Sequence, residues 1–218
     1  MLKIYGVYRS RVSRNVWLAL ELGVPFEHVP VTQYYRLPSP DAAATTLNTR
    51  SPEFLKVNPN AQIPSIDDDG LVLHESLAIN LYLAKKHGGP LAPAGLAEDG
   101  LMTMWALWSV NKVEPHALQI LYNRLDRPPE QRDETLAAAS VETLRTPFAV
   151  LDAHLAATDY LVGNRFTVAD INAAEIFRYA QPAPELFAAA PRVKAWLTRC
   201  QDRPAFKEMM ALRQADPR

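Results

Sequence analysis

A change of pattern near residue 90 is the feature that most constrains the fold of this chain. Before it, short runs with the period of β-strands alternate with helical runs, and after it only helical patterns follow. Gly88-Gly89-Pro90 separates the two parts, because such residues end helices and favour turns. The pattern predicts an α/β domain over residues 1–87, a linker over 88–97 and an all-helical domain over 98–218.

The first part reads as strand, helix, strand, helix, strand, strand, helix. Leu2–Val7 and Phe26–Val31 have strand character, and Ser13–Leu22 has helical spacing. Asp69-Gly70 predicts a tight hairpin between two further strands. Residues 34–48 have no clear period, so we expect a loop there that is either a lid or a plain insertion. This order of elements predicts a mixed four-stranded sheet.

The second part is expected to contain long helices. One is predicted from about Glu98 to Arg124 with a kink at Pro115, since proline lacks an N–H. Another carries an apolar face made by Leu144, Phe148, Leu151 and Leu155. Thr167 and Asp170 have the spacing of a capping box at the start of a further helix.

Composition and charge exclude several classes of function. The formal net charge is −1, which argues against a general nucleic-acid binder. The single cysteine, Cys200, excludes an intramolecular disulfide and a Cys-x-x-Cys redox site, and it is expected to be buried. The five histidines share no metal-ligand spacing, so no metal is expected. No apolar run reaches the roughly 18 residues that span a membrane, and the first residues do not resemble a signal peptide, which predicts a cytoplasmic protein.

Two short motifs flank the predicted hairpin and carry the clearest chemistry. Gln62-Ile63-Pro64 precedes it and Glu75-Ser76 follows it, so the turn brings the two motifs side by side. Ile63 offers backbone groups to an external partner, and Ser76 offers a hydroxyl at a helix N-terminus that favours anions. Glu75 offers a carboxylate for an amine, so the pair suits the head of an amino acid. The alternative is that Ser76 only caps its helix and Glu75 is solvated.

Three motifs together resemble the cytosolic glutathione transferases. They are Asn58–Ser65, Leu73–Ile79 and Phe166–Ile171, in that order along the chain. The resemblance covers nearly the whole chain and implies a thioredoxin-like domain followed by an all-helical domain. It is closest to the serine-type enzymes, theta-like or phi-like, and suggests a bacterial source.

The resemblance also implies a set of glutathione-binding residues. Pro64 would be cis, the Ile63 backbone would pair with the cysteinyl unit, and Glu75 and Ser76 would hold the γ-glutamyl head. Arg50 matches a basic residue that holds the glycyl carboxylate in related classes, although a plain surface arginine is equally compatible. The expected site therefore consists of Arg50, Gln62, Ile63, Pro64, Glu75 and Ser76.

Ser10 is the first candidate for activating the glutathione thiol, because it aligns with the serine of serine-type classes. Tyr8 and Ser13 remain open as alternatives, and Ser13 could instead be the helix N-cap. Tyrosine-type classes carry their tyrosine at the end of the first strand, where this chain has Gly6; Tyr5 lies one position away, and its side chain is expected on the other face of the sheet.

The second-substrate pocket is expected to include Tyr8, Trp105 and Trp108, although the two tryptophans could equally be core residues. The function predicted is conjugation of glutathione, used as a co-substrate without any further cofactor, to an electrophilic and mostly apolar small molecule. A homodimer is expected. The alternatives are a glutathione-dependent isomerase or dehalogenase of the same fold, or a non-catalytic binding module.

Overall fold

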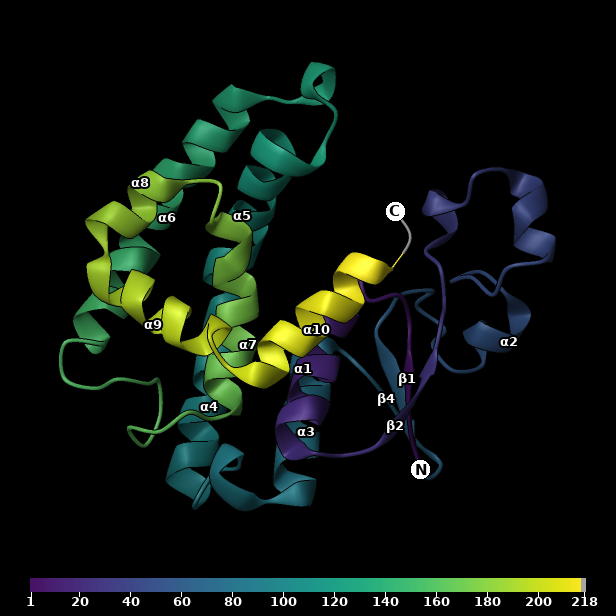
Figure 1. Cartoon of the computed structure of the whole chain (residues 1–218), viewed down its shortest axis with the longest axis horizontal. Helices are drawn as coiled ribbons and strands as arrows, with labels where there is room; N and C mark the ends of the chain where they lie inside the picture. The colour runs from purple at the N-terminus through teal and green to yellow at the C-terminus, as the bar shows by residue number, and fades with distance from the viewer. Residues whose placement is uncertain (217–218) are drawn as a thin grey trace. The chain divides into compact units, whose positions relative to one another are not determined.

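The computed structural model describes residues 1–216, which divide into two compact units (Figure 1). The first, called here the sheet unit, contains residues 1–87 and the C-terminal stretch from Pro204. The second, called the helical unit, contains residues 88–203. Helix α10 (Pro204–Ala215) therefore lies in the sheet unit, whereas the sequence assigned it to the helical domain. The reason is packing: the Phe206 ring meets the Trp17 ring edge-on at 4.9 Å.

A mixed four-stranded sheet forms the centre of the sheet unit, as the sequence predicts. Its strand order is β2-β1-β3-β4, with β1 parallel to β2 and antiparallel to β3. Strands and helices follow one another along the chain in the predicted order. The elements are β1 (Leu2–Tyr5), α1 (Val12–Leu22), β2 (Phe26–Val29), α2 (Pro52–Leu55), β3 (Ser65–Asp68), β4 (Leu71–His74) and α3 (Ser76–His87).

The hairpin between β3 and β4 has the tight turn predicted for an Asp-Gly pair. Asp69 and Gly70 both have positive φ, 53° and 94°, as a two-residue turn with this sequence requires. Residues Asp68 and Leu71 pair across the turn. This return of the chain carries Pro64, just before β3, and Glu75, just after β4, to the same end of the hairpin.

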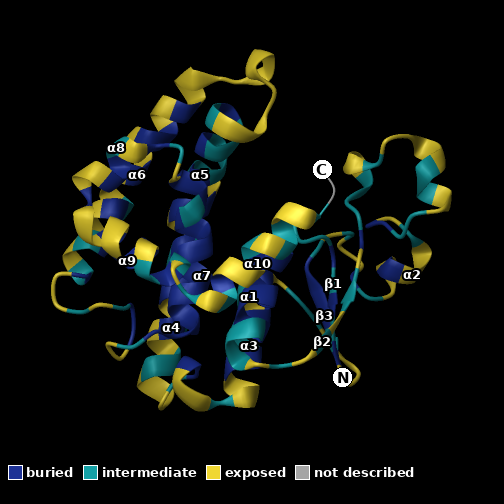
Figure 2. Ribbon diagram, viewed as in Figure 1, coloured by how far each residue is buried: buried dark blue, intermediate teal, exposed yellow. Residues whose placement is uncertain are grey.

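Helix α1 contains more buried residues than any other element of the sheet unit (Figure 2). All of its residues from Val12 to Ala19 are buried, because the helix contacts α3, α10 and β1. Leu2 and Ile4 of β1 are also buried, which is the period-two pattern of a strand. Polar residues of α1 are therefore in the interior, among them Arg14 and Asn15.

The helical unit consists of helices joined by turns and loops, among them the loop over residues 155–167. The expected helix over 98–124 begins at Leu96 and continues to Asp126, with two π-helical stretches in it. One of them, Ser109–Val113, directly precedes Glu114 and Pro115, so the irregularity lies beside the proline that lacks an N–H. The helices are α4 (Leu96–Trp108), α5 (Glu114–Leu121), α6 (Glu134–His154), α7 (Val168–Phe177), α8 (Pro184–Ala189) and α9 (Pro191–Gln201).

The predicted apolar face and capping box are both present in the helical unit. Leu144, Phe148, Leu151 and Leu155 are buried. Thr167 is the N-cap of α7 and forms a capping box with Asp170. Cys200 is also buried, as predicted. Within residues 1–216 no helix combines the length and apolar character that a membrane crossing needs.

Candidate functional site

Gly6 brings the end of β1 into direct contact with the segment that contains Ile63. A Cβ atom at position 6 would lie 2.5 Å from Cγ2 of Val12 and 2.9 Å from Cβ of Ile63. Its φ of 130° is also a conformation that side-chain-bearing residues rarely adopt. A tyrosine cannot occupy this position without moving the loop. The Ile63–Pro64 bond is cis, which confirms the expectation from the resemblance.

Ser10 lies in the turn between β1 and α1, and its hydroxyl is engaged on both sides. Its Oγ donates to the carbonyl of Val7 at 2.6 Å and accepts the N–H of Val12 at 3.1 Å. Arg11, the residue before α1, makes no side-chain cap. The Ser10 oxygen therefore satisfies one of the free amides at the N-terminus of α1, and its single hydrogen points back to the Val7 carbonyl.

The two alternatives to Ser10 are held differently. Ser13 is fully buried, and its hydroxyl donates to the carbonyl of Ser10 at 3.0 Å. Because α1 begins at Val12, the interpretation of Ser13 as the N-cap is wrong. The Tyr8 ring stacks on His28 with centroids 4.1 Å apart. Burial, together with the carboxylate of Asp216, raises the pKa of the Tyr8 phenol.

Residues at the C-terminal end of α10 form hydrogen bonds with the turn between β1 and α1. Nη1 of Arg213 donates to the carbonyl of Tyr8 at 2.8 Å and to that of Ser10 at 3.4 Å. In return, Nε of Arg9 donates to the carbonyl of Asp216 at 2.7 Å. The sequence did not predict these hydrogen bonds, because residues about 200 positions apart share no local sequence pattern.

Glu75 and Ser76 adjoin at the start of α3 in contrasting environments. Glu75 is exposed and has a φ of 72°, an uncommon backbone conformation for a side-chain-bearing residue that often marks a functional position. Ser76 is the first residue of α3, and its hydroxyl accepts a hydrogen bond from Nη1 of buried Arg14 at 3.1 Å. Nδ2 of Asn15 donates to the Ser76 carbonyl at 2.9 Å. The motif is therefore anchored on α1.

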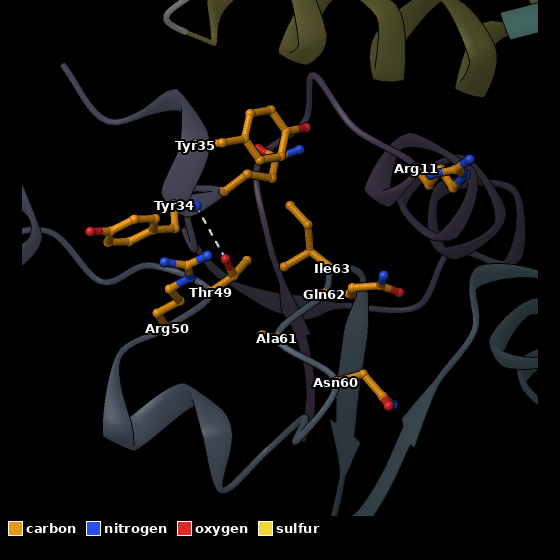
Figure 3. Close-up of a pocket in the computed structure, with 10 residues that line it drawn as sticks. Arg11, Tyr34, Tyr35, Thr49, Arg50, Asn60, Ala61, Gln62 and Ile63 are labelled. Carbon is orange, nitrogen blue, oxygen red and sulfur yellow. Dashed lines mark hydrogen bonds between the residues drawn. The ribbon is translucent and has the colours of Figure 1, made fainter. Parts of the chain in front are cut away.

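A cavity of about 390 Å³ in the sheet unit collects three of the expected residues, Arg50, Gln62 and Ile63 (Figure 3). Pro64, the next residue after Ile63, is buried, and Pro64, Glu75 and Ser76 are not among the lining residues of the cavity. The lining residues are Arg11, Gln33, Tyr34, Tyr35, Thr49, Arg50, Asn60, Ala61, Gln62 and Ile63.

Part of that lining comes from the segment over 34–48, which has two short 3-10 turns, Tyr34–Arg36 and Pro40–Ala44. The sequence did not single out Tyr34, nor Gln33 and Thr49 that flank this segment, because no periodicity there orients the side chains. Gln33 Oε1 is buried and has no hydrogen-bond partner within the described residues. The first turn of the segment thus forms a wall of the cavity.

Trp105 and Trp108 pack among aromatic rings of the helical unit. Their rings meet edge-on at 5.1 Å, Trp105 lies 4.8 Å from the His154 ring, and Trp108 lies 6.3 Å from the Phe177 ring. Trp105 is buried, which fits its alternative interpretation as a core residue, whereas Trp108 stays partly exposed. No group of three or more metal-ligating side chains is arranged around a common point in residues 1–216.

Comparisons with known proteins agree with this arrangement. Residues 4–91 match the family model of the glutathione S-transferase N-terminal domain, and residues 113–204 match that of the C-terminal domain. Glutathione S-transferase 3 of Zea mays is 35% identical, over 96% of this chain and 93% of the relative.

Two solved structures are similar over nearly the whole chain. Glutathione S-transferase III in its apo form has a TM-score of 0.81 and 34% identity, covering 100% of this chain and 99% of the other. A theta class glutathione S-transferase of Xanthomonas axonopodis pv. citri, solved with glutathione bound, has a TM-score of 0.80 and 29% identity, covering 95% of each chain. On this similarity of sequence and fold, the chain belongs to the glutathione S-transferase family.

Proposed function

We propose that this protein transfers the thiolate of glutathione to an electrophilic, mostly apolar small molecule. The observation that carries the proposal is the pair Glu75-Ser76, in which a left-handed backbone exposes a carboxylate beside a hydroxyl held by a buried arginine. Such a pair suits the ammonium and carboxylate of a γ-glutamyl head. The glutathione-bound theta class relative supports the choice of ligand.

Each part of glutathione has a proposed partner in the sheet unit. Glu75 binds the γ-glutamyl ammonium, and Ser76 donates to its carboxylate. The Gln62-Ile63-Pro64 segment offers backbone groups to the cysteinyl unit, since Pro64 itself has no N–H. Arg50 lines the cavity and pairs with the glycyl carboxylate. No metal or further cofactor takes part in this proposal.

Ser10 is the proposed thiol-activating residue, which makes the protein serine-type and similar to the theta and phi classes. A free thiol with a pKa of about 8.5 is only ~3% thiolate at pH 7. Lowering that pKa by about two units corresponds to ~2.7 kcal/mol, and one hydrogen bond to a charged acceptor contributes roughly 1.5–3 kcal/mol. The Ser10 hydroxyl would turn from the Val7 carbonyl to the sulfur, because a thiolate carries a full charge.

Tyr8 and the partly exposed Trp108 are the proposed contacts of the second substrate, and the buried Trp105 ring packs against Trp108.

We also propose a homodimer. Leu101, Met104 and Leu107 on α4 are 45%, 47% and 56% exposed, which is a row of large apolar side chains on one helix. A bacterial source and a cytoplasmic location stay predictions from the sequence.

Binding and turnover test the function together. Glutathione should raise the melting temperature, because a ligand at about 100 times its Kd stabilises the folded state by ~2.7 kcal/mol. A small panel of electrophiles should then yield glutathione conjugates detectable by mass spectrometry. Absence of a thermal shift at millimolar glutathione contradicts the binding site, whereas a shift without any conjugate leaves a binding module as the function.

A further inference from the structure

Arg50 and Tyr34 form a pair at one end of the cavity. The guanidinium carbon of Arg50 lies 4.1 Å from the centre of the Tyr34 ring (Figure 3). This is a close cation–π contact, with the guanidinium lying over the ring. Stacking uses the face of the guanidinium and leaves its N–H edge available, and that edge is what binds a carboxylate with two hydrogen bonds.

The backbone holds the two residues in this relationship. Tyr34 N–H donates to Oγ1 of Thr49 at 3.1 Å, which is the bond drawn in Figure 3. Thr32 N–H donates to the Leu47 carbonyl at 3.0 Å, and Thr49 N–H donates to the Thr32 carbonyl at 2.9 Å. The segments before Tyr34 and before Arg50 therefore run side by side as a short parallel bridge.

Charge pairing does not fix the Arg50 side chain within the protein. The residue is exposed, and no carboxylate in the described part of the chain forms an ion pair with it. Its backbone is fixed by the N–H of Arg50, which donates to Oδ1 of Asn48 at 2.9 Å. Among the described residues, only the Tyr34 ring contacts the guanidinium and restricts where it lies.

We infer that Tyr34 is a positioning residue that holds Arg50 ready for the glycyl carboxylate of glutathione. This inference rests on the proposed function and deepens it, because it gives the aperiodic segment after β2 a role in recognising one end of the ligand. A freely rotating arginine would lose side-chain entropy on binding, and the stacked one has already lost part of it.

The test compares glutathione with its glycyl ethyl ester, in which that carboxylate is neutral. Calorimetry on the full-length protein should show that Tyr34→Leu raises the Kd of glutathione about fivefold, because an unstacked Arg50 side chain loses more conformational entropy when it binds the carboxylate. The Kd of the ester should stay unchanged. Tyr34→Phe keeps the ring and should restore the wild-type Kd of glutathione. In the Arg50→Ala background, Tyr34→Leu should have no further effect.

Tyr35→Leu is the matched control, since it removes the neighbouring ring of the same turn without touching Arg50. If Tyr35→Leu changes the affinity, it should change it equally for both ligands. The ratio of the Kd of the ester to the Kd of glutathione should therefore stay that of the wild type. Equal weakening of glutathione and its ester by Tyr34→Leu, or failure of Tyr34→Phe to restore affinity, overturns the inference while the proposed function stands. Wild-type protein that binds neither ligand overturns both.

Discussion

Arg14 donates a hydrogen bond of 3.1 Å to the hydroxyl of Ser76, although the two residues are 62 positions apart in the chain. Both side chains are almost completely buried, with exposures of 1% for Arg14 and 5% for Ser76. Because Arg14 occupies the oxygen of the hydroxyl, the hydrogen of Ser76 is left to donate. A buried positive charge behind the hydroxyl also favours an anion in front of it.

Ser76→Ala should weaken glutathione binding more than it weakens folding. Loss of one hydrogen bond to a charged ligand group costs ~1.5–3 kcal/mol, which is a Kd increase of roughly 10- to 150-fold. Folding stability should fall by about 1 kcal/mol, because Arg14 loses an acceptor. Titration calorimetry and urea unfolding measure the two effects separately. A loss of stability at unchanged affinity would mean that Ser76 is only structural.

The sequence predicted the residues whose roles depend on local motifs. The Asp69-Gly70 turn, the Thr167–Asp170 capping box and the motifs around Pro64 and Ser76 are each readable over a few residues. The mixed sheet follows from the order of these segments. Local pattern was therefore sufficient for the mixed sheet and the capping box, whereas the cis Pro64 and the glutathione-binding roles were expected from the resemblance to the glutathione transferases.

Residues that act through tertiary contacts could not be predicted in the same way. Nothing in the sequence around Arg14 indicates that its side chain is buried against Ser76, because that contact depends on the packing of α3 on α1. Arg213 belongs to a helix that the sequence assigned to the helical domain. Its hydrogen bond to the Tyr8 carbonyl depends on the packing of Phe206 on Trp17, which holds α10 against α1. Tyr34 lies in a segment without period, so nothing in the sequence orients its ring.

Ser10→Ala should raise the pKa of bound glutathione and lower turnover. Removing one preorganised donor to a developing anion costs ~10²–10³ in rate, and the lower end is expected here because the thiolate charge exists before the reaction. Ultraviolet absorbance of the bound thiolate, followed against pH, reports that pKa without any second substrate.

Tyr8→Phe is the control for Ser10, since it removes a hydroxyl from the same turn. Its titration curve should match that of the wild type. An upward shift with Tyr8→Phe and none with Ser10→Ala would assign the role to Tyr8 instead. Ser13→Ala is less informative, because the buried Ser13 hydroxyl holds the Ser10 carbonyl and its loss would disturb the turn.

Asp170→Ala should destabilise the protein much more than Thr167→Ala, although both belong to one capping box. The Asp170 carboxylate accepts hydrogen bonds from Leu161 N–H at 3.0 Å, Thr167 N–H at 2.9 Å and the Trp196 indole at 2.9 Å. Loss of the Thr167 cap costs ~1 kcal/mol, whereas leaving several buried donors unsatisfied costs about 3 kcal/mol or more. Urea unfolding should give this order, with glutathione affinity of the folded protein unchanged for both variants.

Met104→Lys should convert the proposed homodimer to a monomer. Met104 is the middle residue of the row that Leu101, Met104 and Leu107 form on α4, and a charge there would have to be desolvated in an interface. Sedimentation should give about twice the chain mass of 24.3 kDa for the wild type and a single chain for the variant. A wild-type species of one chain mass at micromolar concentration would contradict the dimer.

Glu98→Gln should destabilise the helical unit in a way that disappears at acid pH. Nη1 and Nη2 of Arg165 donate to the two oxygens of Glu98 at 2.9 and 2.6 Å, and the Ala94 N–H donates to Glu98 at 2.8 Å. The Arg165 hydrogen bonds are the main cause that lowers the pKa of Glu98 from 4.5 to about 2. A carboxyl group whose pKa is lower in the folded state binds fewer protons there, so its stabilising contribution is complete above pH 4.5. The contribution then falls as the pH drops from 4.5 towards 2.

The difference in unfolding free energy between wild type and Glu98→Gln should accordingly be largest at pH 7 and shrink steadily below pH 4.5. Urea unfolding followed by tryptophan fluorescence at a series of pH values measures this difference. Glu130→Gln is the control, because Glu130 is exposed and forms no ion pair with any residue that the structure describes. Its difference from the wild type should stay small at every pH. A Glu98→Gln effect that persists undiminished at pH 3 would mean that the glutamate acts through packing or neutral hydrogen bonds, since neither depends on the charge of its carboxylate.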